Sequence, residues 1–222
     1  KLFLAGASNI EAKKEYINEL NVFPVPDGDT GTNMSLTISY AMKELAKVEN
    51  DSITDIGKSL SKGSLMGARG NSGVILSQIL RGISKGLEGK TSVNSVEFAN
   101  AFVEGSKAAY KAVMKPKEGT ILTVAKGMSE KSVTLVKENV TDMEEFISKI
   151  IEHGDYVLSQ TPEMLPVLKQ AGVVDSGGQG LMEVVRGAFD AYLGKEVDIT
   201  VTPAATVSAK PNLDVQADMD IK

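Results

Sequence analysis

Apolar residues recur at intervals of three and four through most of this chain, and this spacing restricts the fold more than any other feature of the sequence. Such residues share one face of an α-helix, so each run predicts an amphipathic helix that buries one side. The spacing predicts helices over residues 33–48, 52–66, 72–87, 95–114, 120–137 and 177–193, one that follows Asp142, and a first one that begins at a capping box of Ser8 and Glu11. We therefore expect an all-α protein with eight or nine helices.

The aromatic content agrees with helices packed on helices. Aromatic residues make up 5% of the chain and Trp is absent, so Leu, Ile, Val, Met and Ala must supply the core volume. Residues 197–202 alternate as a strand does, and beyond Pro203 the chain becomes rich in small, polar and acidic residues. We expect one folded domain over residues 1–195 and a linker toward a further domain over residues 196–222.

Charge and cysteine content exclude several classes of function. The formal net charge of −5 argues against a basic surface for nucleic acid. The absence of Cys excludes disulfides, thiol catalysis and Cys-ligated zinc, and it is compatible with the cytoplasm, where we place the protein. No apolar run reaches the roughly 18 residues of a membrane span, so we expect no membrane insertion.

The densest cluster of functional side chains lies in residues 21–33, whose sequence is NVFPVPDGDTGTN. Asp27 and Asp29 flank Gly28, so both carboxylates can turn toward one point. Mg²⁺ prefers oxygen ligands, usually one or two carboxylates with phosphate oxygens and water. The loop leads into a predicted helix, and the first amides of a helix favour anions. It therefore predicts a site for a metal ion and the phosphates that it neutralises.

Three more segments place Gly, Ser, Thr, Asn or Asp at the start of a predicted helix, namely residues 63–73, 115–120 and 172–180. If these helix starts converge, their free amides form one anion-binding cup. None of the segments is a Walker motif or a GxGxxG motif following a strand, and the acidic loop lacks the last carboxylate of an EF-hand.

Each segment also has a plainer interpretation. Asp-Gly pairs are common in turns, and Asp175 suits an ordinary helix N-cap. Gly63 and Gly67 have the spacing of residues at a close contact between helices. Arg69 is either a surface charge or a phosphate ligand.

Four segments together resemble a known family: NVFPVPDGDTGTNM at 21–34, MGARGNSGVIL at 66–76, VMKPKEGTILTV at 113–124 and GVVDSGG at 172–178. They are similar to the DhaL-type nucleotide-binding domain of the dihydroxyacetone kinase family, and most similar to the N-terminal ATP-binding domain of the bacterial fatty acid kinase A subunit. The resemblance covers residues 1–195. It implies an up-down barrel of about eight helices that binds ATP or ADP at one end.

The resemblance also implies the residues of the site. Two Mg²⁺ ions lie between the phosphates and three acidic positions, of which Asp27 and Asp29 match two and Asn21 replaces the third. Asp27 and Asp29 are then the catalytic residues and, with Asn21, the metal ligands. Nucleotide contacts fall on Thr30, Gly31, Thr32, Asn33, Arg69, Asn71, Ser72, Gly73, Gly119, Thr120, Asp175, Ser176, Gly177 and Gly178.

For function, the resemblance implies transfer of the γ-phosphate of ATP to a fatty acid carboxylate. The fatty acid is carried by a separate protein of the fatty acid kinase B type, and the intact kinase is a homodimer. Thr30 stands where DhaL proteins have His, which favours this branch. The alternatives are the nucleotide-binding subunit of a dihydroxyacetone kinase, a noncatalytic nucleotide-sensing module, and a purely structural bundle whose glycine clusters are turns.

Overall fold

The protein was analysed as a computed structural model that describes residues 1–196. The expected strand at 197–202 and almost all of the expected linker lie outside the described residues. The helices are α1 (Leu2–Glu19), α2 (Thr30–Leu45), α3 (Ile53–Gly67), α4 (Gly70–Gly86), α5 (Ser95–Ala112), α6 (Ile121–Lys137), α7 (Met143–Met164), α8 (Pro166–Ala171) and α9 (Ser176–Tyr192). The described part of the chain contains no strand, and the all-α prediction is confirmed.

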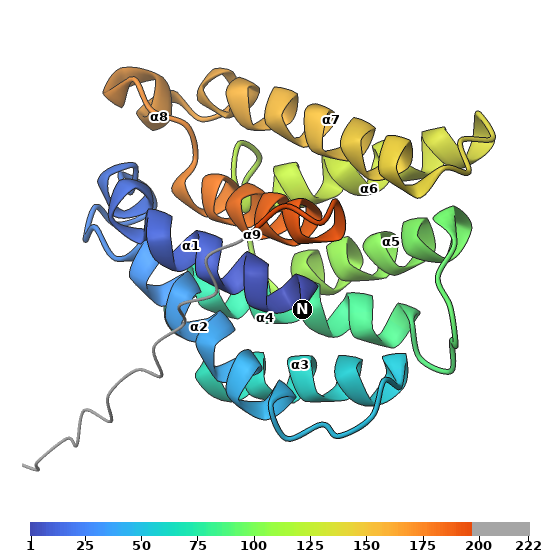
Figure 1. Cartoon of the computed structure of the whole chain (residues 1–222). Helices are drawn as coiled ribbons and strands as arrows, with labels where there is room; N and C mark the ends of the chain where they lie inside the picture. The colour runs from blue at the N-terminus through green and yellow to red at the C-terminus, as the bar shows by residue number, and fades with distance from the viewer. Residues whose placement is uncertain (197–222) are drawn as a thin grey trace, which may run out of the picture.

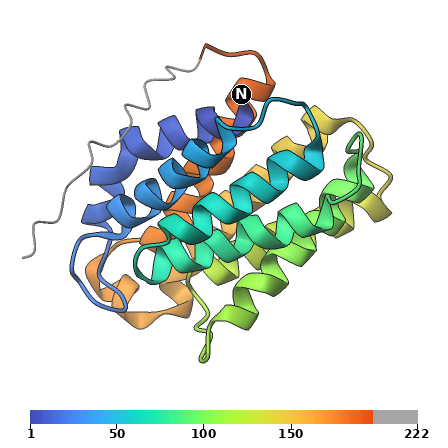
Figure 2. The same ribbon diagram turned by 90° about the horizontal axis from the view of Figure 1, so that it is seen from below.

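The long helices alternate in direction and close into a ring (Figure 1). Around the ring, α1 contacts α2, α2 contacts α4, α4 contacts α5, α5 contacts α6, α6 contacts α9, and α9 contacts α1. Helix α3 covers α2 and α4, and α7 covers α6 and α9. Figure 2, turned by 90°, shows the same antiparallel arrangement with connecting loops gathered at the two ends of the bundle. This is the expected up-down architecture.

Aliphatic side chains fill the interior, as the composition predicts. The fully buried residues include Ile10, Met34, Leu76 and Met128, and Phe146 is the largest of them. None of the described helices is both long enough and apolar enough to cross a bilayer.

Glycine lets α3 lie directly on α2. A Cβ at Gly63 would stand 2.6 Å from Ala41 Cα, and a Cβ at Gly67 would stand 2.3 Å from Tyr40 Cβ. Neither position leaves room for a methyl group, so the predicted close contact between helices is confirmed.

The predicted start of the first helix is wrong. Helix α1 begins at Leu2, and Ser8 lies buried in its second turn, where its hydroxyl has no hydrogen-bond partner among the described residues. The segment before Ser8 is helical because its small residues bury against α9: a Cβ at Gly6 would lie 2.7 Å from the carbonyl oxygen of Val184. Glu11 accepts a hydrogen bond from Ser35 of α2 and does not complete a capping box.

Helices α2 and α8 also differ from the prediction. Helix α2 begins at Thr30, three residues before the predicted start, so residues 30–32 form its first turn. The short helix α8, which begins at Pro166, was not predicted. It is too short to show an apolar period.

Candidate functional site

The first residues of α2, α4, α6 and α9 lie together at one end of the bundle (Figures 1 and 2). The hydroxyl of Ser176 donates to that of Thr30 at 3.1 Å and thereby joins α9 to α2. The backbone N–H of Arg69 donates to the hydroxyl of Thr37 at 3.3 Å and joins α4 to α2. A Cβ at Gly177 would lie 3.2 Å from Ile121 Cβ, so α9 also touches the start of α6. The four helix starts named by the glycine clusters therefore converge.

The acidic loop before α2 presents two unpaired carboxylates. Gly28, between Asp27 and Asp29, has a φ of 66°, a left-handed conformation that favours glycine. Asp27 is exposed and Asp29 half-buried, and neither carboxylate makes a hydrogen bond or ion pair within residues 1–196. Two adjacent negative charges without a partner suit a divalent cation.

Within the described residues, no group of three or more His, Asp and Glu side chains is arranged to hold a metal ion. Asp27 and Asp29 supply two carboxylates, which is what Mg²⁺ commonly takes from a protein when phosphate and water complete its shell. The residues present therefore fit a Mg²⁺ ion whose remaining ligands are phosphate oxygens and water.

Asn21 holds the acidic loop in place. It is 6% exposed, and its Oδ1 accepts hydrogen bonds from the backbone of Asp29 and Thr30, each at 3.2 Å, and from the Thr30 hydroxyl at 2.8 Å. Its Nδ2 donates to the carbonyl of Val25 at 2.9 Å. An oxygen that already accepts three hydrogen bonds is poorly placed to bind a metal as well, which argues against the ligand role that the resemblance implies for Asn21.

Asn18 has a related role that the sequence did not reveal. Its Oδ1 accepts from the backbone N–H of Thr32 at 3.1 Å, while its Nδ2 donates to the Thr32 hydroxyl at 3.0 Å. Asn21 accepts from the Thr30 amide, Asn18 from the Thr32 amide, and the Asp29 carbonyl from the Asn33 amide. The amide of Gly31 is therefore the one in this turn without an acceptor in the described residues. A Cβ at Gly31 would stand 2.1 Å from the carbonyl oxygen of Lys14, so this glycine lets α1 and α2 touch.

Helix α4 differs from α2 because its start is uncapped. Arg69 is its N-cap and makes no side-chain cap, and no acceptor within the described chain receives the amides of Gly70, Asn71 and Ser72. Free amides at a helix start favour an anion. Gly73 instead serves packing, since a Cβ there would lie 2.4 Å from the Thr37 hydroxyl.

Arg69 is exposed beside these amides. One of its guanidinium nitrogens donates to the carbonyl of Ala68 at 3.0 Å, and its guanidinium carbon lies 5.9 Å from the centre of the Tyr40 ring. The side chain forms no ion pair among the described residues, so its charge remains available to an anion near α4.

The loop before α6 is tied to the helix that follows it. Gly119 is buried and its N–H donates to the Thr123 hydroxyl at 2.9 Å, which in turn donates to Glu118 at 2.7 Å. Thr120 caps α6 by accepting from Leu122. Tyr110 of α5 donates to Glu118 at 3.2 Å, and burial together with the Glu118 charge raises the pKa of Tyr110 to about 12.

The start of α9 is buried. Residues 175–178 all lie beneath the surface, so the Asp175 carboxylate is enclosed by its neighbours in the described chain. Its Oδ2 accepts from Gly178 N–H at 2.7 Å, and its own N–H donates to Thr161 of α7 at 3.1 Å. Burial raises the pKa of the Asp175 carboxyl to about 6, against hydrogen bonds from the backbone of Gly178 and Ile121 that favour the charged form.

A family model described as the DAK2 domain matches residues 24–190, from the acidic loop to the last turns of α9. The chain belongs to the DAK2 domain family.

Relatives of this DAK2 domain are longer proteins. Protein YloV of Bacillus subtilis is 51% identical over 197 residues, which make up 89% of this chain and 35% of that protein. An uncharacterised protein of Staphylococcus aureus is 47% identical over 200 residues, 90% of this chain and 36% of its own length. The DAK2 domain thus spans about a third of the curated relatives that it matches.

A solved structure shares the fold. The crystal structure of the dihydroxyacetone kinase from C. freundii in complex with AMP-PNP and Mg²⁺ superposes with a TM-score of 0.61 at 15% identity, over 86% of this chain and 33% of that one. At this identity the likeness establishes a common architecture for the DAK2 domain.

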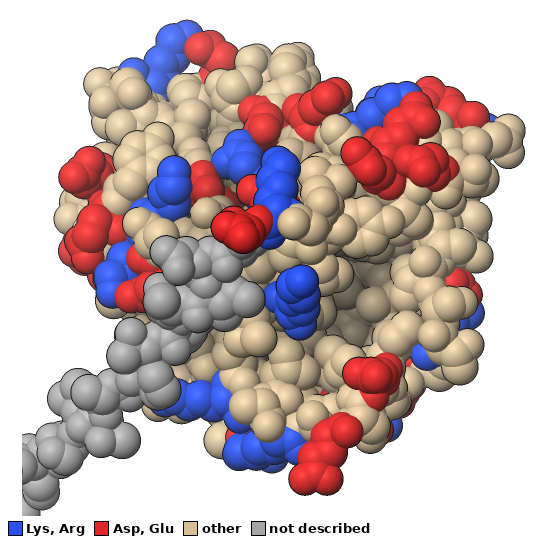
Figure 3. All heavy atoms as spheres, viewed as in Figure 1, with Lys and Arg blue, Asp and Glu red and all other residues tan. Residues whose placement is uncertain are grey.

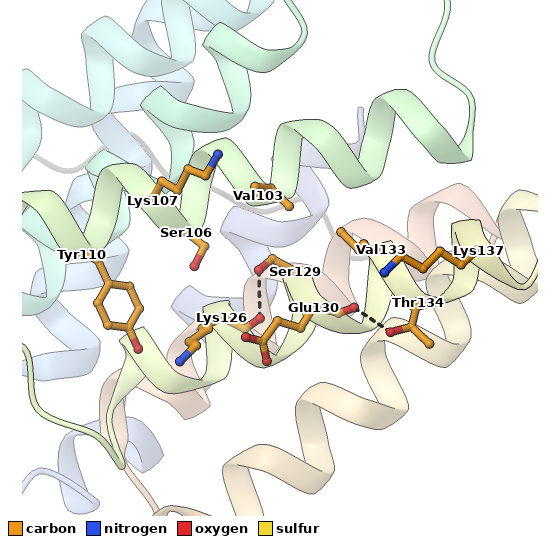
Figure 4. Close-up of a pocket in the computed structure, with 10 residues that line it drawn as sticks. All are labelled: Val103, Ser106, Lys107, Tyr110, Lys126, Ser129, Glu130, Val133, Thr134 and Lys137. Atoms are coloured by element: carbon orange, nitrogen blue, oxygen red, sulfur yellow. Dashed lines mark hydrogen bonds between the residues drawn. The ribbon is translucent and has the colours of Figure 1, made fainter.

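The DAK2 domain also carries a groove of about 570 Å³ between α5 and α6, away from the acidic loop. Val103 and Val133 face each other across it, and Lys137 reaches over its edge (Figure 4). Tyr110 lines its other end and links it to the loop before α6 through Glu118. No sequence pattern indicated this groove.

The charges of the DAK2 domain are dispersed. On the face shown in Figure 3, Lys and Arg alternate with Asp and Glu, and no continuous basic area is visible.

Proposed function

We propose that this DAK2 domain binds ATP with Mg²⁺ and forms the nucleotide-binding part of a phosphotransferase. The observation that carries the proposal is that two unpartnered carboxylates, Asp27 and Asp29, lie near the uncapped start of α4. Asn33, one helical turn after Asp29, touches that start: a Cβ at Gly70 would lie 2.5 Å from Asn33 Nδ2. One part suits a cation and the other suits the phosphates bound to it. The AMP-PNP and Mg²⁺ held by the C. freundii kinase of the same fold support this assignment.

Each group has a defined task in the proposal. Asp27 and Asp29 hold Mg²⁺, and the amides of Asn71 and Ser72 receive phosphate oxygens, with Arg69 adding charge. Bound Mg²⁺ would neutralise the negative charge that grows on the transferring phosphoryl group. The nucleotide site is then a matter of position and electrostatics, with Asn21 and Asn18 keeping the acidic loop fixed.

We propose, more specifically, that the acceptor is a fatty acid carboxylate presented by a separate carrier protein. A carboxylate is ionised at neutral pH, so its attack needs no general base. The described site supports this, because the Thr30 hydroxyl is buried and engaged by Asn21 and Ser176, and no His lies among the converging helix starts. The two-ion arrangement and a dimer of the intact protein are parts of the same proposal.

A dihydroxyacetone kinase role is the alternative, and the shared architecture with the C. freundii enzyme favours it equally. A hydroxyl acceptor needs its proton removed, so this alternative requires a general base at the acceptor. The longer form of the protein, incubated with ATP, separates the two. Turnover with a fatty acid and its carrier supports the first, turnover with dihydroxyacetone supports the second, and nucleotide binding without turnover in either assay indicates a sensing module.

The nucleotide site itself is tested by calorimetric titration with AMP-PNP in the presence and absence of Mg²⁺. We expect binding that depends on Mg²⁺ and disappears in the double variant Asp27→Asn, Asp29→Asn. Asp51→Asn is the matched control, because Asp51 is an exposed acid in the loop at the other end of α2. Equal affinity without Mg²⁺, or an unchanged double variant, would contradict the proposal.

A further inference from the structure

We infer that Asp175 is a positioning residue for this nucleotide site: its buried carboxylate fixes the start of α9, which in turn fixes the loop that carries Asp27 and Asp29. The inference rests on the proposed function. It assigns Asp175 no contact with nucleotide, and it follows from a continuous set of buried polar contacts between three helices.

Asp175 joins α9 to its two neighbours in the interior. Its carboxylate accepts from the amide of Gly178, and the start of α9 packs on the start of α6, where a Cβ at Gly177 would lie 3.2 Å from Ile121 Cβ. Its N–H donates to the hydroxyl of Thr161 on α7, and Thr161 is fully buried. The side chain is 5% exposed, so solvent cannot replace these contacts when they are lost.

From Asp175 the contacts continue to the acidic loop. The adjacent Ser176 donates its hydroxyl to that of Thr30 at 3.1 Å, and Thr30 donates onward to Asn21 Oδ1 at 2.8 Å. The same Asn21 oxygen receives the backbone N–H of Asp29 at 3.2 Å. A displacement of Ser176 therefore changes the position of Asp29 through three hydrogen bonds.

Packing prevents the start of α9 from absorbing such a displacement elsewhere. A Cβ at Gly178 would lie 2.9 Å from Val124 Cγ2 and 3.0 Å from Leu158 Cδ1, so α9 is seated directly on α6 and α7. Because α9 cannot move toward α6 or α7, we expect its first turn to shift toward α2 when the Asp175 cap is lost. Buried partners of metal-binding residues typically change metal affinity by about 10- to 100-fold when they are removed.

The test compares Asp175→Ala with Asp175→Asn, which keeps an oxygen acceptor for Gly178. We expect the alanine variant to bind AMP-PNP with Mg²⁺ about 10- to 100-fold more weakly than the wild type. We expect the asparagine variant to stay within about threefold, because Asn is as good an N-cap as Asp. Equal loss in both variants, or no loss in the alanine variant, would overturn the inference.

Destabilisation alone is excluded by a control in the distal half of α7. Ile150→Val lowers stability by thinning the core, and Ile150 is remote from the acidic loop. All variants are compared at a temperature where circular dichroism shows each to be folded. If Ile150→Val weakens nucleotide binding as much as Asp175→Ala does, Asp175 has no specific positioning role.

A second readout needs no nucleotide and so separates the two proposals. Amide hydrogen exchange at Asp29 and Thr30 reports the hydrogen bonds to Asn21, and we expect Asp175→Ala to accelerate it while Asp175→Asn does not. If the wild type fails to bind AMP-PNP, the proposed function falls, and the exchange result still decides the positioning role. Unchanged exchange in Asp175→Ala would refute it.

Discussion

Three aspartates near the converging helix starts occupy opposite environments. Asp27 is exposed and Asp29 half-buried, and neither carboxylate has a partner in the described chain, whereas Asp175 is enclosed and hydrogen-bonded. The difference follows from the donors that each meets: no donor within the described chain reaches the carboxylate of Asp27 or Asp29, while the Gly178 amide in the first turn of α9 donates to Asp175. Local sequence is similar at both places, since each is an aspartate beside glycine or serine.

The raised pKa of Asp175 makes the stability of the protein depend on pH. Its folded pKa of about 6 exceeds the usual value, so its protonation stabilises the folded state fully below pH 4 and this contribution is lost as the pH rises through 6. Asp175→Asn removes the titration. Between pH 4 and pH 7 we expect the wild type to lose about 3 kcal/mol of unfolding free energy relative to the variant. Urea unfolding across this range measures it, and parallel stability curves would refute it.

Asn21 tolerates a carboxylate poorly in this setting. In Asn21→Asp the new oxygen facing Val25 cannot donate to a carbonyl that now accepts at 2.9 Å. We expect a loss of about 1–3 kcal/mol in unfolding free energy at neutral pH. The penalty should shrink at acid pH, because a protonated carboxyl regains the donor. Thermal melts at pH 4 and pH 7 measure both effects, and an increase in stability at pH 7 would contradict this account of the loop.

At the scale of elements, the apolar period predicted the long helices because each buries one continuous stripe. Helix starts were predicted less well, since they depend on partners distant in sequence. Asn18 and Asn21 of the preceding segment cap α2, which therefore starts at Thr30. Ser8 and Glu11 have the letters of a capping box, but α9 covers the segment before them and extends α1. The sequence identified the helix starts that carry the glycine clusters and left their convergence as a condition. The burial of Asp175 was not predicted, because no local pattern reveals which helices cover it.

The contact of α3 with α2 predicts a contrast between two glycines of one helix. In Gly63→Ala the new methyl group would meet backbone atoms of Tyr40 and Ala41 at 2.6 Å, and we expect a loss of about 2 kcal/mol or more. Gly57→Ala meets Ser84 at 3.2 Å and gains about 1 kcal/mol of helix propensity, so its net change should be near zero. Denaturant unfolding compares the two. Equal effects would show that the α2–α3 contact is looser than described.

At the scale of the molecule, the ring of antiparallel helices places the two sets of loops at opposite ends. The loops before α2, α4 and α6 lie at the end with Asp27 and Asp29, and those at residues 46–52, 88–94 and 138–142 lie at the other. A ligand at one end therefore leaves the other in solvent. The closed ring could be expected from the family resemblance, whereas periodicity alone fixes neither the order of neighbours nor which loops meet.

This separation predicts where nucleotide protects the backbone. With AMP-PNP and Mg²⁺ bound, amide exchange should slow at residues 27–33 and 69–73 and remain unchanged at residues 46–52, 88–94 and 138–142. At a free ligand concentration about 100 times Kd, the unfolding free energy should also rise by about 2.7 kcal/mol. Hydrogen exchange followed by mass spectrometry locates the protection. Protection confined to the α5–α6 groove would place the nucleotide elsewhere.

The glycines that bring backbone onto backbone have a mechanical consequence. Gly31 meets the backbone of Lys14, Gly63 that of Ala41 and Gly187 that of Ala5, so main-chain atoms of the two helices are in direct contact at these three points. Sliding one helix along another would drive main-chain atoms together at each of these points. The barrel therefore resists sliding of its helices along their axes. A force applied at one end is transmitted to the other end by the helices, and the loops are the parts that deform.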